Sequence, residues 1–367
     1  MERFYVHNLL PAPLLWRMLH FDGEQHFYRE LGFSGKRSNG ESYYWRDKEN
    51  TIVDQESFYS ALRQRLPLQL HFDVLSHSRE KDRRALREER EIVMDIDLTD
   101  FVRYCRCGEE KRACPVCWLH VEGASFILHH LLTRRYGVEE RHLLWVFSGM
   151  KGFHCVVNDR RLTRLANEQR LRLFKLLSRP TLEDKKQFLA ELTVDDADFV
   201  AALETLFDER VIRHRDLLRQ QTFSDACLTM VRRHFPALHN TLTLDWYRLR
   251  DEHSTVRWQR LLTLQRGQFD GYVTPSLLIA LHCYYPCVDK GPLCMQHLFK
   301  LPFSVHATTG RIALPVERHE LISDTLPSDA LTLAQLQAAY DGSSEESIAP
   351  AFMRGCHLLD AWLAHYH

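Results

Sequence analysis

Residues 161–267 contain a single glycine, Gly267, and carry apolar side chains at three- and four-residue spacing. The runs LRLFKLLS, KKQFLAEL, ADFVAALETLF and WQRLLTLQR show this period most clearly. A period near 3.6 residues gathers apolar side chains on one face of a helix, which then packs against a core. We therefore predict that residues 161–270 form an inserted helical subdomain.

The segments on either side have a different pattern. Residues 42–75 carry short runs of aromatic and aliphatic side chains interleaved with polar ones, which predict strands with a helix over 58–66. The run LLWVFSGMKGFHCVV predicts two strands joined by a glycine-containing turn. Residues 14–32 predict one or two helices that end at Gly32. The fold class is therefore α+β.

This division gives the chain four parts. We predict that residues 1–160 are the first part of a mixed α/β core and that residues 271–330 are its second part. The helical subdomain, 161–270, is inserted between them. Residues 331–367 are expected to form closing helices around an acidic loop, DGSSEES.

Composition excludes several classes of protein. The 48 Lys and Arg residues almost balance the 49 Asp and Glu residues, so binding to nucleic acid needs a local basic patch or a partner. No run approaches the roughly 18 apolar residues that cross a bilayer, and the N-terminus lacks the pattern of a secretion signal. We expect a soluble intracellular protein without membrane contact, whose ten cysteines are metal ligands or core residues.

Two aspartates, Asp95 and Asp97, follow an apolar run in VMDIDLTD. Alternation along a strand points both carboxylates to one face, where they repel each other. Divalent cations neutralise such a pair, which is the arrangement of a two-metal phosphoryl-transfer site, and a third carboxylate is then expected from elsewhere. The alternative is an exposed strand end with capping aspartates. Asp100 lies outside the alternation, and we interpret it as a turn cap.

Four cysteines crowd into thirteen residues with the spacing C-x-C-x6-C-x2-C. They are Cys105, Cys107, Cys114 and Cys117. Two close pairs of thiolates can surround one tetrahedral Zn²⁺, and a site filled by four protein ligands is structural. The sequence therefore predicts a zinc knuckle over 105–117. The weaker alternative is that some of these thiols are simply buried.

A second group also has ligand-like intervals. It consists of Cys283, Cys287, Cys294 and His297. Because this group lies in an aromatic and apolar stretch, and because small cysteines are common in cores, we favour a core role for it.

Two segments are candidates for binding phosphate. The turn between the predicted strands carries Ser148, Lys151 and, just beyond, His154, next to backbone N–H groups that glycines leave accessible. In KLPFSVHATTGR, Lys300 and His306 form a second pair of cationic side chains. The alternatives are an ordinary hairpin turn in the first segment, and a surface lysine with a hydrogen-bonded histidine in the second.

In combination, these motifs resemble the catalytic small subunit of eukaryotic and archaeal DNA primases, and the eukaryotic form most closely. The resemblance rests on EIVMDIDLTDF, the cluster ending CPVCW, FSG with KGFHCVV, and KLPFSVHATTGRI, in that order over roughly residues 14–316. It implies a primase core with an RRM-like catalytic sheet, the zinc knuckle and a helical insertion. The implied reaction is the synthesis of short RNA primers from ribonucleoside triphosphates on single-stranded DNA.

The resemblance also assigns roles to residues. Asp289, in PCVDKG, becomes the third carboxylate beside Asp95 and Asp97, and the three would hold two Mg²⁺ or Mn²⁺ ions. Side chains expected to bind the nucleotide are Ser148, Lys151, His154, Lys300 and His306. The implied partners are a primase large subunit and the DNA polymerase alpha complex, and the implied location is the nucleus.

The chain departs from the family pattern in several places. Met150 occupies the first of two positions that are usually basic, and Asp54 falls where an arginine is expected on an early strand. Arg46 is a candidate to replace the missing charge. The Asp289–Lys300 interval is about one residue short, and Arg106 separates a cysteine pair that is usually adjacent. Two alternatives follow: a primase-polymerase that acts in repair, and a structural subunit that has lost catalysis.

Overall fold

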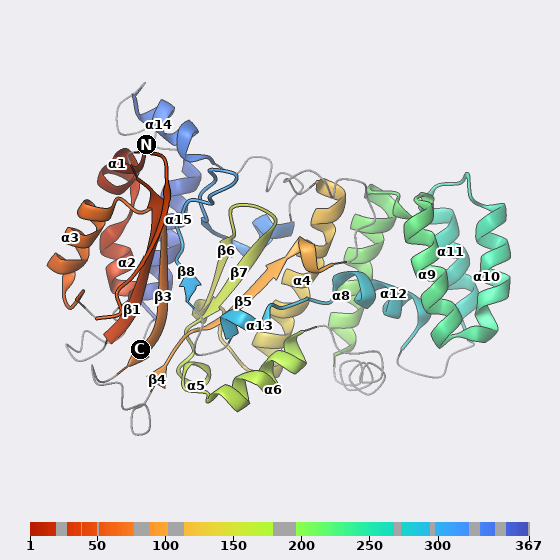
Figure 1. Cartoon of the computed structure of the whole chain (residues 1–367). Helices are drawn as coiled ribbons and strands as arrows, with labels where there is room; N and C mark the ends of the chain where they lie inside the picture. The colour runs from red at the N-terminus through yellow and green to blue at the C-terminus, as the bar shows by residue number, and fades with distance from the viewer. Residues whose placement is uncertain are drawn as a thin grey trace.

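The structure is a computed structural model of the whole chain. It describes residues 1–19, 28–37, 39–49, 51–76, 88–101, 114–178, 196–267, 273–293, 298–322, 331–341 and 350–365. These residues form a mixed arrangement of helices and antiparallel sheets, so the predicted α+β class is confirmed (Figure 1). No helix in these ranges is long and apolar enough to cross a membrane.

The first sheet is built mainly from the N-terminal part of the chain. Its strands lie in the order β2 (Ser42–Arg46), β1 (Tyr28–Lys36), β3 (Gln69–Ser76) and β4 (Glu88–Glu89), and β8 (Phe299–Lys300) also pairs with β3. Leu31, Phe33 and Leu70 are buried on one face of this sheet. The short helices α1 (Glu2–Phe4), η1 (Tyr5–Leu9), α2 (Ala12–Leu19) and α3 (Gln55–Arg65) contribute to the same core.

The prediction of helix up to Gly32 is wrong from Tyr28 onward, and residues 20–27 lie outside the described residues. Helix α2 ends at Leu19, and Gly32 lies in the middle of β1, where it pairs with His71 on one side and Arg46 on the other. Leu31 and Phe33 straddle Gly32 and are buried, so burial on one face of a sheet determines the structure of this segment.

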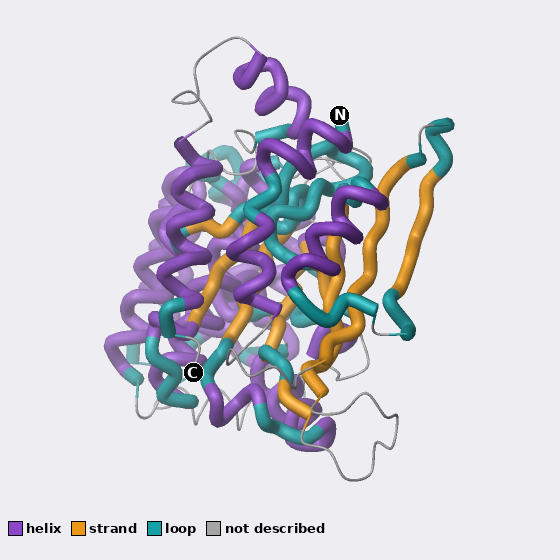
Figure 2. Tube along the Cα trace, turned by 90° about the vertical axis from the view of Figure 1, so that its left-hand side faces the viewer, coloured by secondary structure: helices purple, strands orange, loops and turns teal. Residues whose placement is uncertain are grey.

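The second sheet lies at the centre of the molecule. Its order is β5 (Ile92–Asp97), β7 (Gly152–Val157), β6 (Leu143–Phe147) and β9 (Pro315–Val316). One face packs on α4 (Pro115–His130), and the other packs against the core shared with the first sheet and α15 (Pro350–Leu363). Strands β6 and β7 are buried along their whole length, so their connecting turn is carried on a rigid support. Figure 1 shows both strands near the middle of the molecule, and Figure 2 shows strands with helices alongside them.

The remaining described elements are helices and short helical turns. They are η2 (Leu98–Asp100), η4 (Leu131–Arg135), η5 (Glu140–His142), α5 (Arg160–Thr163), α6 (Asn167–Leu177), α8 (Ala197–Phe207), η6 (Asp208–His214), η7 (Leu217–Arg219), α9 (Gln221–His234), α10 (Pro236–Arg248), α11 (Ser254–Gln265), α12 (Pro275–Tyr284), α13 (Lys290–Leu293), η8 (Arg318–Ile322) and α14 (Leu333–Asp341). Helices α8 to α12 extend from α4, away from the first sheet (Figure 1).

A buried ion cluster joins these helices to the central layer. The Glu122 carboxylate of α4 is fully buried and accepts hydrogen bonds from Arg210 at 3.0 and 3.1 Å and from Arg215 at 2.7 and 3.2 Å. Next to it, Gly123 allows close contact with α12, because a Cβ there would lie 1.9 Å from the Tyr284 ring. Helices α12 and α4 therefore pack at a distance that only glycine permits.

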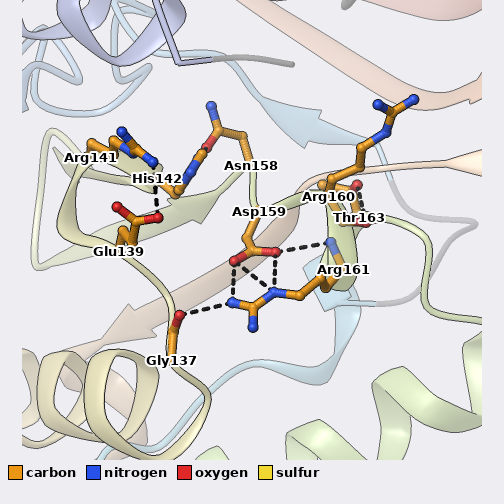
Figure 3. A network of polar contacts seen from close by, with 9 residues as sticks. All are labelled: Gly137, Glu139, Arg141, His142, Asn158, Asp159, Arg160, Arg161 and Thr163. Carbon is orange, nitrogen blue, oxygen red and sulfur yellow. Dashed lines mark hydrogen bonds and ion pairs between the residues drawn. The ribbon is translucent and has the colours of Figure 1, made fainter.

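The end of the β6–β7 pair remote from its connecting turn is fixed by polar contacts (Figure 3). Asp159 caps α5 and accepts hydrogen bonds from the Arg161 side chain, which also donates to the carbonyl of Gly137 at 2.8 Å. His142 Nδ1 lies 2.8 Å from Asn158 Oδ1 and links the start of β6 to the end of β7. Both strands are thus held at one end, while the turn over 148–151 is at the other.

Candidate functional site

Three carboxylates from two distant segments converge at the end of β5. Asp95 pairs with His154 and Asp97 with Gly152, so both aspartates lie on the same face of the strand, as predicted. The Asp289 N–H donates to the carbonyl oxygen of Asp95 at 2.9 Å, which aligns the 287–289 segment with β5. All three side chains line one cavity of about 490 Å³.

The predicted phosphate-binding turn stands next to this cavity. Ser148, Lys151 and His154 are each at most 9% exposed. The turn is closed by two hydrogen bonds: the Ser148 N–H donates to the Gly152 carbonyl at 3.0 Å, and the Gly152 N–H donates to the Ser148 hydroxyl at 3.2 Å. Gly149 has a φ of +90°, a conformation that favours glycine, and it lies against the loop that carries His306.

The second predicted pair comes from β8 and the loop beyond it. The Lys300 ammonium donates to the Ser148 carbonyl at 2.8 Å, which places a cation directly beside the turn. Thr309 Oγ1 donates to the Gly149 carbonyl at 2.7 Å and ties the loop of His306 to the same turn. The structure therefore brings together all eight residues predicted for catalysis and nucleotide binding, which lie up to 211 positions apart between Asp95 and His306.

Burial and mutual repulsion alter the protonation of the site. Burial, followed by the charges of Asp97 and Asp289, raises the pKa of Asp95 to about 7. Burial lowers the pKa of Lys300 to about 8, although the charge of Asp95 opposes this. Burial and the charge of Lys300 lower the pKa of His154 and of His306, so both histidines are neutral at neutral pH.

The raised pKa of Asp95 predicts a pH-dependent stability of the metal-free protein. Between about pH 4 and pH 7 the native state keeps a proton on Asp95 that the unfolded chain loses. The contribution of this proton to the free energy of unfolding is therefore fully present below about pH 4 and is lost as the pH rises through about 7. We expect Asp95→Asn to be more stable than the parent near pH 8 and equal to it near pH 4. Urea unfolding in the presence of a chelator measures the free energy of unfolding of both proteins at both pH values. The same difference between Asp95→Asn and the parent at pH 4 and at pH 8 would contradict the prediction.

The structure shows where two residues that depart from the family pattern, Asp54 and Met150, lie. Asp54 is not on a strand, because it caps α3, where its side chain accepts a hydrogen bond from the Ser57 N–H at 2.7 Å. Assigning the missing arginine to this position was therefore wrong. Arg46 does lie on β2, in the same cross-strand row as His71 and Lys300, and it hydrogen bonds to Glu30. Met150 occupies the turn as expected and supplies no charge.

Sequence reasoning missed further residues that line the carboxylate cavity. They are Thr99, Asp100, Cys287, Val288 and Lys290. Asp100 is the most informative, because we interpreted it as a cap of a turn or of the following segment. The Leu98–Asp100 turn is capped by Asp97 instead, which accepts from the Thr99 N–H at 2.7 Å, and the segment after Phe101 lies outside the described residues. The signal that could have identified Asp100 is its position three residues after Asp97.

The predicted zinc knuckle is only half covered by the structure. Cys105 and Cys107 lie outside the described residues, so the knuckle stays a prediction. Cys114 caps α4, and its sulfur accepts from the Cys117 N–H at 3.3 Å. In the alternative cysteine group, Cys283 is buried and Cys287 is half-buried, while Cys294 and His297 also lie outside the described residues. Within the described ranges, no three His, Cys, Asp or Glu side chains, Asp95, Asp97 and Asp289 included, are placed to form a metal-binding group.

Comparisons with known proteins agree on one family. A family model described as DNA primase small subunit matches residues 94–318, more than half of the chain. The DNA primase small subunit of Caenorhabditis elegans is 27% identical over 288 residues, covering 72% of this chain and 69% of the relative. The protein of the same name from Saccharomyces cerevisiae is 25% identical, with 71% and 65% covered, and that from Drosophila melanogaster is 23% identical, with 88% and 81% covered.

Proposed function

Because this chain belongs to the DNA primase small subunit family, we propose that it is the catalytic subunit that synthesises short RNA primers on single-stranded DNA. The observation that carries the proposal is the convergence of Asp95, Asp97 and Asp289 in one cavity beside the Ser148–Lys151 turn. Carboxylates that repel one another in a partly buried cavity, next to a cationic turn, suit a reaction between phosphate groups and divalent cations.

We propose that these carboxylates bind a pair of Mg²⁺ or Mn²⁺ ions. Both ions prefer oxygen ligands. Burial and, after it, the charges of Asp97 and Asp289 raise the pKa of Asp95, and bound cations would relieve the repulsion among the three carboxylates. Asp95, Asp97 and Asp289 would hold them. When bound, such ions activate an attacking hydroxyl and stabilise the pyrophosphate that leaves.

The residues around the turn would hold the nucleotide. Lys151 and Lys300 would neutralise the triphosphate, and the Ser148 hydroxyl with the backbone N–H groups of the turn would donate to its oxygens. His154 and His306 are neutral and would contribute N–H hydrogen bonds instead of charge. This division of roles concentrates positive charge where the leaving pyrophosphate develops negative charge.

The proposed reaction joins two ribonucleotides. The 3′-oxygen of one bonds to the α-phosphorus of the next, the bond from that phosphorus to the bridging oxygen breaks, and pyrophosphate leaves with the electron pair. The hydroxyl proton passes to solvent. No side chain forms a covalent bond, because positioning and charge stabilisation account for catalysis in phosphoryl transfer.

The wider setting of the proposal comes from the family. The net charge of −1 provides little long-range attraction for template DNA, so we propose that a primase large subunit and the DNA polymerase alpha complex supply it. A nuclear location, a structural Zn²⁺ at Cys105, Cys107, Cys114 and Cys117, and an RRM-like catalytic sheet belong to the same proposal.

Primer synthesis on unprimed single-stranded DNA tests the function. With ribonucleoside triphosphates, Mg²⁺ or Mn²⁺ and the large subunit, the parent should produce alkali-labile oligomers. No product under these conditions would contradict the proposal and favour a structural subunit. Efficient synthesis from deoxynucleotides without the large subunit would instead favour a primase-polymerase.

Lys300 provides a separate test of nucleotide binding. Lys300→Met removes a buried cation, and because one charged hydrogen bond contributes about 1.5 to 3 kcal/mol, nucleotide affinity should fall about ten- to a hundredfold. Lys300→Arg should retain most of the affinity. Titration of a fluorescent triphosphate analogue measures both, and equal affinity of Lys300→Met and the parent would remove Lys300 from the site.

A further inference from the structure

The loop that carries His306 is closed by hydrogen bonds within its own backbone. Val305 pairs with Ile312 across the base of the loop, and the His306 N–H donates to the Arg311 carbonyl at 2.7 Å. The Gly310 N–H donates back to the His306 carbonyl at 2.8 Å. The loop therefore has a defined shape without any contact to a ligand.

The Thr309 hydroxyl connects this loop to the turn over 148–151. It donates to the Gly149 carbonyl at 2.7 Å and accepts from the Arg311 N–H at 3.2 Å, so it acts both as a donor and as an acceptor within the protein. The two segments approach closely, because a Cβ at Gly149 would lie 3.0 Å from the Cβ of His306. A single side-chain hydroxyl thus links two segments that are far apart in the sequence.

The same loop determines which nitrogen of the His306 ring carries the hydrogen. The backbone N–H groups of Thr308 and Thr309 donate to Nδ1 at 3.3 and 3.4 Å. A backbone N–H can only donate, so Nδ1 is the acceptor, and Nε2 carries the hydrogen of the neutral ring. Burial and the charge of Lys300 lower the pKa of His306, whereas the charge of Asp97 raises it, so the ring is within electrostatic reach of both.

We propose that Thr309 is a positioning residue for the nucleotide, and that its hydroxyl holds the His306 loop against the turn so that both bind one triphosphate. The inference rests on the proposed function, because it assumes that His306 and the turn bind the nucleotide together. Thr309 acts through His306 and needs no contact of its own with the ligand. Its contribution is preorganisation, which lowers the entropic cost of ordering the binding groups when the triphosphate arrives.

A double-mutant cycle on the full chain tests the inference, with a fluorescent ribonucleoside triphosphate analogue titrated in the presence of Mg²⁺. Thr309→Val keeps the branched shape and removes the hydroxyl, and we expect the affinity to fall about three- to tenfold, as for the loss of one hydrogen bond. Thr309→Ser keeps the hydroxyl and should retain most of the affinity. In a His306→Ala background, Thr309→Val should change the affinity by less than about twofold, because the residue through which it acts is absent.

The neighbouring threonine provides the matched control. Thr308→Val makes the same chemical change at an exposed position of the same loop, where the hydroxyl forms no hydrogen bond within the described part of the chain, and it should bind like the parent. Thermal melting of each variant shows that it is folded at the temperature of the titration.

The outcomes separate this inference from the proposed function. Parent-like affinity of Thr309→Val, together with weaker binding by His306→Ala, would overturn the role of Thr309 alone. An equal loss from Thr309→Val with and without His306 would also overturn it, because Thr309 would then act independently of the histidine. A parent chain that binds the triphosphate no better than His306→Ala would overturn both the proposed nucleotide site and this inference.

Discussion

Replacing both Asp95 and Asp97 by asparagine should reduce primer synthesis about a thousandfold or more. The two carboxylates lie on one face of β5 and are two of the three that we propose to hold the cations. Charge stabilisation by bound metal contributes several kcal/mol to such transition states, and each 1.36 kcal/mol is a factor of ten in rate. Initial rates of RNA synthesis on single-stranded DNA, with the large subunit present, measure the loss.

The same double variant should fold at least as well as the parent. Both substitutions remove carboxylates from a cavity in which burial, followed by the charges of Asp97 and Asp289, raises the pKa of Asp95. Circular dichroism melts in chelator therefore distinguish lost catalysis from lost structure. Asp198→Asn, an exposed position near the start of α8, is the matched control and should leave the rate unchanged. Activity of the double variant within tenfold of the parent would contradict the assignment of these carboxylates.

Gly152→Ala should lower the free energy of unfolding by about 4 kcal/mol or more. Gly152 is opposite Asp97 on β7, and a Cβ there would lie 1.8 Å from the carbonyl oxygen of Ile96. The obstacle is backbone of the neighbouring strand, so β5 would have to move away and lose its pairing with β7. Overpacking usually costs less than this, but here no side chain can yield.

Urea unfolding of Gly152→Ala measures the effect, with Gly35→Ala as a control in another strand. A Cβ at Gly35 would lie 3.1 Å from a ring atom of Tyr43 and 3.3 Å from the backbone nitrogen of Leu68, contacts that shifts of a few tenths of an ångström relieve. Gly35→Ala should therefore cost much less. Equal unfolding midpoints for the two variants would show that β5 and β7 do not approach each other this closely.

The parts of the site that the sequence predicts are those governed by local geometry. Strand alternation is enough to place Asp95 and Asp97 on one face, and the glycines around Met150 are enough to predict the turn. Asp100 escaped this reasoning because alternation stops at Asp97 and a different periodicity, that of the 3₁₀ turn, takes over.

The parts that could not be predicted locally depend on long-range pairing. Nothing near Lys300 reveals that β8 pairs with β3 or that its ammonium contacts Ser148. Asp289 was identified only through family resemblance, because the hydrogen bond from its N–H to Asp95 joins distant segments. Gly32 was assigned to a helix end because the spacing of its apolar neighbours fits either period, and only the position of the adjoining strands decides between them.

We propose that Asp95, Asp97 and Asp289 hold two divalent cations at which ribonucleotides are joined. The most direct test is a crystal structure with Mn²⁺ and a non-hydrolysable ribonucleoside triphosphate, using anomalous scattering from manganese. We predict two peaks about 3.5 to 4 Å apart between these carboxylates, with the triphosphate against Lys151 and Lys300. Manganese peaks elsewhere, or none in this cavity at saturating Mn²⁺, would contradict the account.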